Sequence, residues 1–295
     1  MCDEFIHPGL VSDPRLSRRG FGLMTAAAAA GAASPALAQD PLKDNVTETD
    51  VSVKTPDGTC DAVLFHPKLG GSKQQWPAVL VWPDIMGLRP VFRDLGRRLA
   101  GQGYTVLVVN PFYRSARAPV IGDNFDFSNP EQRAKLTGYR AAMTNDGIDR
   151  DAVAYLAFLD AQAVTDKTKK AGVQGYCMGG TLSFRTAAMV PDRIAAVGSF
   201  HGGNGLCSDK PDSPHLLIGR TQAAYLVCHA QNDDAQNPKM KDDLKAAFAA
   251  AGKTATVEVY AANHGWCVKG SQAYHEAEAE RAWAALDALY KTRLG

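Results

Sequence analysis

The residues of this 295-residue chain that are best placed to do chemistry lie in Gly-Tyr-Cys-Met-Gly-Gly, residues 175–180. The pattern G-x-C-x-G suits a nucleophile elbow, a sharp strand-to-helix turn in which flanking glycines relieve crowding around a strained nucleophile. A strand-like run, residues 171–176, leads into Cys177, and an apolar, helix-capable run, residues 181–189, follows. This context predicts a nucleophilic thiol at Cys177. The alternative is a chance match within a glycine-rich loop.

A nucleophilic cysteine needs a base, a group that orients the base, and donors for the developing oxyanion. Downstream of Cys177, His264 follows the last predicted strand and precedes a glycine, which makes it the best base. Two acids, Asp233 and Asp234, follow an earlier strand, and the position of Asp234 four residues before Pro238 favours Asp234. Asp233 stays open as the alternative. The order nucleophile, acid, histidine is that of α/β-hydrolases, so the sequence predicts Cys177, Asp234 and His264 as catalytic residues.

The elements that must position these residues follow from hydrophobic patterning. Continuous apolar runs, typical of strands buried on both faces, occupy residues 77–82, 104–110, 194–200 and 224–228. An alternating hairpin, residues 50–63, comes first, and a last strand covers residues 255–260. Helical periodicity covers residues 89–102, 149–161, 238–251 and 272–293.

This alternation predicts an α/β-hydrolase fold, with a mostly parallel central sheet and helices on both faces. Ligands bind beyond the carboxyl ends of such strands, and the elbow lies at that edge. The irregular segment 111–129 is a candidate cap over a pocket.

The first 38 residues read as an export signal. Ser-Arg-Arg-Gly-Phe-Gly-Leu, residues 17–23, resembles a twin-arginine motif, and a weakly apolar run precedes a small-x-small cleavage site at residues 36–38. The alternative is an amphipathic helix or membrane anchor, but the apolar run is short for a bilayer. We therefore expect a signal peptide over 1–38, one domain over 39–295, transient contact with the twin-arginine export machinery, and a periplasmic or secreted location.

Net charge and cysteine spacing bear on the partners and on the kinds of cysteine site that the chain can have. The net charge of +1 gives no reason to expect nucleic acid or an anionic membrane as a partner. No C-x-x-C pair occurs, which argues against a redox or structural zinc site. A disulfide among Cys60, Cys207, Cys228 and Cys267 stays open.

Taken together, these motifs resemble the dienelactone hydrolase family over residues 50–292. The elbow, the segment Pro-Asp-Ile-Met-Gly at residues 83–87, the acid and the histidine carry the resemblance. It implies a carboxylic ester hydrolase for small lactones or esters, without cofactor or metal. It also implies that Asp84 gates the thiol, accepting its hydrogen bond until substrate arrives, and that the backbone N–H groups of Met178 and Ile85 form the oxyanion hole.

The chain departs from the family pattern at two points. Asp84 stands where glutamate is typical, and the arginine expected after the histidine for a substrate carboxylate is missing, with Lys269 a step further on. His201 and Trp266 are candidates for the substrate pocket. Competing functions are a non-catalytic ligand-binding module that keeps the elbow as a relic, and redox sensing at Cys177.

Overall fold

The computed structural model describes residues 45–68, 74–122 and 125–295, and within these ranges eight strands form one sheet in the order β1-β2-β4-β3-β5-β6-β7-β8. The strands are β1 Val46–Thr55, β2 Gly58–Pro67, β3 Ala78–Trp82, β4 Thr105–Val109, β5 Ala171–Tyr176, β6 Ile194–Phe200, β7 Ala224–Ala230 and β8 Ala255–Tyr260. The α-helices are α1 Pro90–Gly101, α2 Pro130–Ala141, α3 Asn145–Asp160, α4 Met178–Met189, α5 Gln231–Gln236, α6 Met240–Ala250 and α7 Glu276–Leu294. Short 3-10 turns cover η3 Gly203–Gly205 and η4 Pro214–Arg220.

The pairing of the strands confirms the predicted fold class. β1 and β2 form the antiparallel hairpin, and β2 also runs antiparallel to β4. From β4 through β3, β5, β6 and β7 to β8 every neighbouring pair is parallel. The carboxyl ends of β3, β5, β6, β7 and β8 therefore meet at one edge of the sheet, where the candidate site residues follow them.

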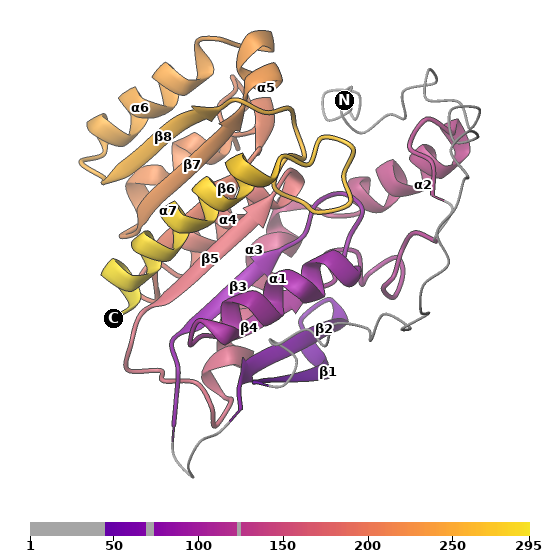
Figure 1. Ribbon diagram of the computed structural model, residues 1–295, viewed down its shortest axis with the longest axis vertical. Helices are drawn as coiled ribbons and strands as arrows, with labels where there is room; N and C mark the ends of the chain where they lie inside the picture. The colour runs from indigo at the N-terminus through magenta and orange to yellow at the C-terminus, as the bar shows by residue number, and fades with distance from the viewer. Residues whose placement is uncertain (1–44, 69–73, 123–124) are drawn as a thin grey trace, which may run out of the picture.

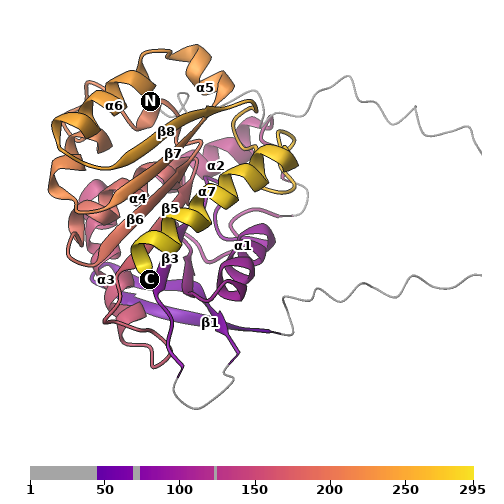
Figure 2. The ribbon, with the colours of Figure 1, turned by 60° about the vertical axis from the view of Figure 1, so that its left-hand side comes forward.

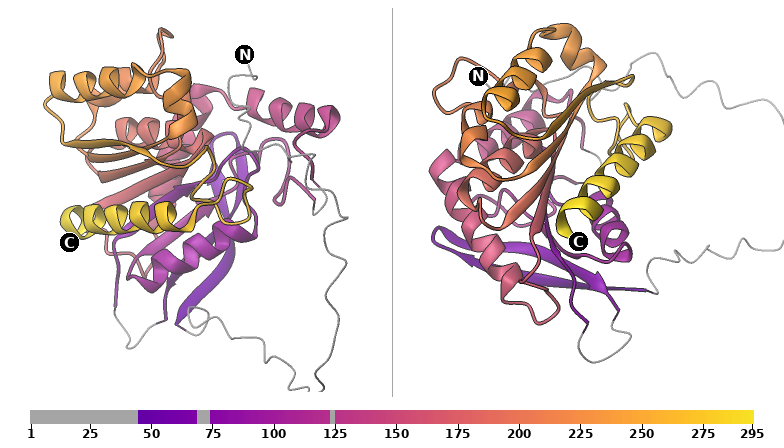
Figure 3. Two further views of the ribbon diagram at one scale, coloured as in Figure 1. Left: turned by 45° about the horizontal axis from the view of Figure 1, so that its top comes forward. Right: turned by 90° about the vertical axis from the view of Figure 1, so that its left-hand side faces the viewer.

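Helices cover both faces of the sheet. α1 and α7 lie on the face turned to the viewer in Figure 1, and Figure 2 shows them on one side of the sheet with α3 and α4 on the other. In the left view of Figure 3, α2 lies at the margin of the molecule, away from the sheet. The arrangement is a sandwich of three layers, helix, sheet and helix.

The apolar composition of the central strands follows from this coverage. Every residue of β3 and of β4 is buried, and alternate side chains enter different cores. Leu80 and Trp82 belong to the core under α3 and α4, while Val79 and Val81 belong to the core under α1 and α7. A strand with cores on both faces must be apolar at successive positions, which is the signal that the sequence carries.

Two helices were not expected from the sequence, and both have a local cause. α2 begins at Pro130 behind Asn129, whose side chain accepts hydrogen bonds from the next backbone N–H groups. Leu136 is the one buried residue of α2, a helix that the structure describes in full. Without an apolar stripe, periodicity gives no signal for it. The six-residue α5 is too short for periodicity to detect.

The predicted export signal, residues 1–38, lies outside the described residues. Within the part of the chain that the structure describes, no helix has both the length and the apolar character needed to cross a bilayer.

Candidate active site

Cys177 occupies a strained turn between β5 and α4. Its φ of 54° lies in the left-handed region, which is uncommon for residues other than glycine. The Cys177 N–H donates to the carbonyl of Phe200 at 2.9 Å, and the N–H of Gly180 donates to the Cys177 carbonyl at 2.9 Å. These bonds tie the turn to β6 and to the first turn of α4. Strain held in this way is a feature of functional sites.

Two glycines make the turn sterically feasible. A Cβ atom built on Gly175 would lie 1.9 Å from the carbonyl oxygen of Gly179. A Cβ atom built on Gly179 would lie 2.3 Å from the carbonyl oxygen of Trp82, at the end of β3. Both contacts are far below van der Waals distance, so these positions of the G-x-C-x-G pattern exclude any side chain.

The Cys177 thiol is protonated at neutral pH. Burial raises the pKa of Cys177, the charge of Asp84 raises it further, and Asp233 adds a smaller effect in the same direction. The backbone N–H groups of Met178 and Ile85 interact with the sulfur and lower the pKa, but the net value is about 12. The two N–H groups predicted to form the oxyanion hole therefore both lie close to the sulfur, and their part in binding an oxyanion stays a prediction.

The acid beside the histidine is Asp233, which corrects the preference for Asp234. His264 Nδ1 lies 2.8 Å from Asp233 Oδ2, and both side chains are fully buried. Asp234 instead bonds Lys241 at 2.7 Å, and both members of that pair are partly exposed. The reason is that both acids lie on α5, where successive side chains point about 100° apart. Only Asp233 faces the sheet edge.

The hydrogen bond with Asp233 decides the tautomer of His264. An ionised carboxylate only accepts, so Nδ1 carries the proton and Nε2 keeps its lone pair. Burial lowers the pKa of His264 below its ordinary value, which favours the neutral imidazole. The backbone N–H of His264 also donates to Asn232 Oδ1 at 2.8 Å, and this bond fixes the loop after β8 to α5.

Asp84 is held by Arg89, a residue that the sequence reading did not single out. Arg89 Nη1 lies 2.6 Å from Asp84 Oδ1, and Arg89 Nη2 lies 2.8 Å from Asp84 Oδ2. Asp84 Oδ1 also accepts from the Met86 N–H at 2.9 Å. Among the described residues, no hydrogen bond joins Asp84 and Cys177, so Asp84 acts on the thiol through its charge.

His201 and Trp266, the candidates for the substrate pocket, are buried close to His264. His201 follows β6 with a φ of 39°, and its ring packs edge-on against His264 with centroids 4.7 Å apart. Trp266 is fully buried and stacks on Tyr260 with centroids 4.6 Å apart. Neither residue borders the cavity beside Ile85, and neither do Cys177 and His264. His201 and Trp266 support the histidine from the core.

The segment Asp84–Gly87, which carries the predicted oxyanion donor Ile85, is called the oxyanion turn. A cavity of about 430 Å³ opens beside it. Ile85 borders it on one side, and Thr181 and Leu182 of α4 border it on another. Arg140 of α2, together with Lys210 and Asp212 of the loop after β6, places charges of both signs in its wall. Lys269, the cation nearest in sequence to the position of the missing arginine, lines a different cavity, between α1 and α7.

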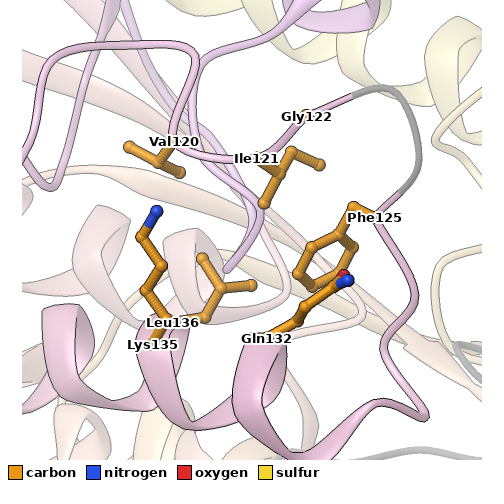
Figure 4. A pocket seen from close by; sticks show the side chains of 7 residues that line it. All are labelled: Val120, Ile121, Gly122, Phe125, Gln132, Lys135 and Leu136. Carbon is orange, nitrogen blue, oxygen red and sulfur yellow. The ribbon is translucent and has the colours of Figure 1, made fainter.

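A second cavity, of about 350 Å³, lies under the segment predicted to act as a cap. Figure 4 shows Val120 and Ile121 facing Lys135 and Leu136 of α2 across this cavity, with Phe125 at its side. Val120 also packs against Gly87, since a Cβ atom built on Gly87 would lie 3.0 Å from a methyl group of Val120. This cavity is therefore adjacent to the oxyanion turn.

The disulfide left open among Cys60, Cys207, Cys228 and Cys267 is not formed in the described residues. Cys60, Cys177, Cys207, Cys228 and Cys267, the cysteines within the described ranges, are all free thiols. In the same ranges, no group of three or more His, Cys, Asp or Glu side chains is arranged to hold a metal ion.

Comparison with known proteins identifies the family of the chain. Residues 60–294 match the sequence model of the dienelactone hydrolase family. A protein of Methylorubrum extorquens, provisionally named a carboxymethylenebutenolidase, is 28% identical over 291 residues, which cover 96% of this chain and 95% of its own. A protein of Escherichia coli strain K12 with the same provisional name is 28% identical over 225 residues, or 74% of this chain and 78% of its own.

Solved structures show the same fold. A provisionally assigned dienelactone hydrolase of Klebsiella pneumoniae superposes with a TM-score of 0.71 at 22% identity, covering 83% of this chain and 98% of that chain. At this level of identity, the likeness bears on the fold alone.

Proposed function

The chain belongs to the dienelactone hydrolase family, and we propose that it is a cysteine-dependent hydrolase of small lactones or esters. In this proposal Cys177 is the nucleophile, His264 the base and Asp233 the acid that orients it. The observation that carries the proposal is the meeting of two backbone donors, from Met178 and Ile85, on one strained and buried thiol.

The resting site holds a neutral thiol and a neutral imidazole. Because burial raises the pKa of Cys177 and lowers that of His264, a thiolate–imidazolium pair is disfavoured before substrate binds. Proton transfer from Sγ to His264 Nε2 therefore accompanies attack on the carbonyl carbon. Asp233 stabilises the imidazolium that forms, since its carboxylate accepts from Nδ1 at 2.8 Å.

Acylation forms an Sγ–C bond and places negative charge on the former carbonyl oxygen. The N–H groups of Met178 and Ile85 would stabilise that charge, and one such donor is typically worth roughly 2.7–4 kcal/mol. As the C–O bond breaks, His264 returns its proton to the departing oxygen. Water then attacks the thioester, gives its proton to His264, and releases the acid and the Cys177 thiol.

The cavity beside Ile85 supports a small substrate. Its volume of about 430 Å³ suits one small molecule, and Ile85 of the oxyanion turn borders it, while Cys177 and His264 are not among its lining residues.

The proposal is tested by replacing the nucleophile. Cys177→Ala should lower turnover of a chromogenic aryl ester by roughly 10³-fold or more, while the melting temperature stays close to wild type. Cys207→Ala is the matched control, because this half-buried thiol lies on the loop after β6. Unchanged turnover in Cys177→Ala would refute the proposal, because hydrolysis would then not depend on this thiol. Wild-type protein without turnover would instead favour a non-catalytic ligand-binding module.

We also propose that residues 1–38 direct twin-arginine export of a single domain, residues 39–295, which then works in the periplasm or outside the cell. Fusing residues 1–38 to a reporter that is active only after export, with Arg18 and Arg19 changed to lysine as control, tests this. Equal export of both fusions would contradict it.

A further inference from the structure

We infer that Arg89 is a positioning residue of this site, which clamps Asp84 so that the turn Asp84–Gly87 holds the Ile85 N–H at the Cys177 sulfur. The inference rests on the proposed function and deepens it. It also gives Asp84 a different role from that implied by the family resemblance, a fixed member of the oxyanion turn in place of a mobile acceptor of the thiol proton.

The clamp is two-pronged and includes the backbone of the turn. Both guanidinium Nη atoms of Arg89 bond separate carboxylate oxygens of Asp84, at 2.6 and 2.8 Å. Nη1 also donates to the carbonyl of Gly87 at 3.2 Å, and the Met86 N–H donates to Asp84 Oδ1 at 2.9 Å. Because Arg89 holds a side chain at one end of the turn and a carbonyl at the other, it fixes the residues between them.

Burial makes the clamp rigid. The side chains of Arg89 and Asp84 are 13% and 7% exposed, so water competes little for either group. The guanidinium also lies over the ring of Phe92, 5.0 Å from its centroid, which holds Arg89 against α1. Breaking such a pair leaves an uncompensated charge in the protein, unlike breaking a surface ion pair.

The clamped turn delivers a donor to the reacting atom. Ile85 lies between Asp84 and Met86, and its N–H interacts with the Cys177 sulfur. The turn itself is closed by the bond from the Gly87 N–H to the Asp84 carbonyl at 2.9 Å. A shift of Asp84 would therefore move the Ile85 N–H, whereas the Met178 N–H on α4 would stay in place.

The clamp also fixes the position of the Asp84 carboxylate. Oδ1 accepts from Arg89 Nη1 and the Met86 N–H, and Oδ2 accepts from Arg89 Nη2. As long as the clamp holds, Asp84 contributes a fixed negative charge beside the thiol, and the proton of Cys177 passes to His264.

The test compares Arg89→Met with Arg97→Met on a chromogenic aryl ester. Arg97 lies on α1, is 14% exposed and pairs with Glu48 and Asp94, which are 24% and 65% exposed. It is a control for the loss of a mostly buried arginine side chain and its ion pairs close to the same helix. Arg89→Met should lower kcat roughly 10- to 100-fold and leave KM within about threefold, because a displaced oxyanion donor matters in the transition state. Arg89→Lys should recover part of kcat, and Arg97→Met should match wild type.

A double-mutant cycle shows whether Arg89 acts through Asp84. We expect Asp84→Asn combined with Arg89→Met to have a kcat within about twofold of the slower single variant, because both changes release one turn. Wild-type kcat in folded Arg89→Met would overturn the inference, as would single-variant losses that multiply in the double variant. A mobile gating acid would instead make Asp84→Asn slow and Arg89→Met close to wild type.

Circular dichroism and melting temperature establish folding for each variant. If Arg89→Met is unfolded at the assay temperature, Arg89→Lys and Asp84→Asn carry the cycle. The outcomes are separable from those of the proposed function. Turnover by Cys177→Ala refutes the cysteine mechanism itself, whereas inactive Cys177→Ala together with fully active Arg89→Met refutes only the role of Arg89.

Discussion

The assignment of Asp233 as the acid leads to a sharp comparison of two adjacent residues. Asp233→Asn removes the carboxylate that holds His264, and Asp234→Asn removes a neighbour one residue along α5. If the geometry decides function, only the first change should disable the enzyme. The two variants share composition, helix and charge change, so each serves as the control for the other.

The expected size of the effect follows from the hydrogen bond. Asp233 lies 2.8 Å from His264 Nδ1 with both side chains buried, so no water can replace the lost carboxylate. An asparagine can donate to Nδ1 and favour the wrong tautomer, and it cannot stabilise the imidazolium. Such a change typically costs about 10²- to 10⁴-fold in kcat, or about 3–5.5 kcal/mol of activation free energy.

Asp234→Asn should have almost no effect. The Asp234 side chain is 22% exposed and its partner Lys241 is 27% exposed. An ion pair of this kind contributes about 0–1 kcal/mol to the free energy of unfolding, and kcat should stay within about twofold of wild type.

Steady-state kinetics on a chromogenic ester, with melting curves for both variants, decides the matter. The expected pattern is a large loss of kcat for Asp233→Asn with a folded protein, and wild-type kcat for Asp234→Asn. The reverse pattern would refute the reasoning from α5 and restore the acid that the sequence favoured. Equal losses in both variants would show that the local charge, rather than the hydrogen bond to His264, is what matters.

Two further predictions concern stability. His229 on β7 is fully buried, its ring nitrogens have no hydrogen-bond partner among the described residues, and burial lowers its pKa to about 4. Because the unfolded chain takes up this proton near pH 6.5, the free energy of unfolding should fall as the pH drops from 6.5 to 4. His229→Gln should reduce that slope by up to about 1.4 kcal/mol per pH unit in urea titrations, and an unchanged slope would contradict the assignment. Gly179→Ala should cost at least about 3 kcal/mol of unfolding free energy, because its Cβ would meet the Trp82 carbonyl at 2.3 Å. Gly219→Ala, whose Cβ meets nothing within 4 Å, is the control, and equal shifts in melting temperature would contradict the packing argument.

The parts of the fold that the sequence predicted well are those whose signal is local. β6 spans Ile194–Phe200 and β8 spans Ala255–Tyr260, as expected, because hydrophobic runs between polar loops mark strands directly. The elbow was also predictable, because only glycine fits at positions 175 and 179, and the sequence shows glycine at both.

The acid and the clamp were harder to predict for a physical reason. Chain spacing gives both Asp233 and Asp234 the same place after β7, and only the rotation of α5 decides which side chain faces His264. Arg89 resembles any polar residue at the start of a helix, and its partner Asp84 was assigned to the thiol. Contacts set by the orientation of a short helix or a turn leave no periodic trace in the sequence.

In the proposed mechanism, the neutral resting state of the site explains how a buried cysteine would serve as a nucleophile. A thiolate is the form that peroxide oxidises, and burial together with the charge of Asp84 keeps Cys177 protonated. A neutral His264, with its Nδ1 held by Asp233, can still take the proton when a carbonyl carbon is within reach of the sulfur. The attack then moves negative charge from the sulfur, which lies near Asp84, to the former carbonyl oxygen. There the N–H groups of Ile85 and Met178 would donate hydrogen bonds to it. The charge of Asp84 thus disfavours the free thiolate and favours the attack that transfers its charge to oxygen, provided that Arg89 holds Asp84 in place.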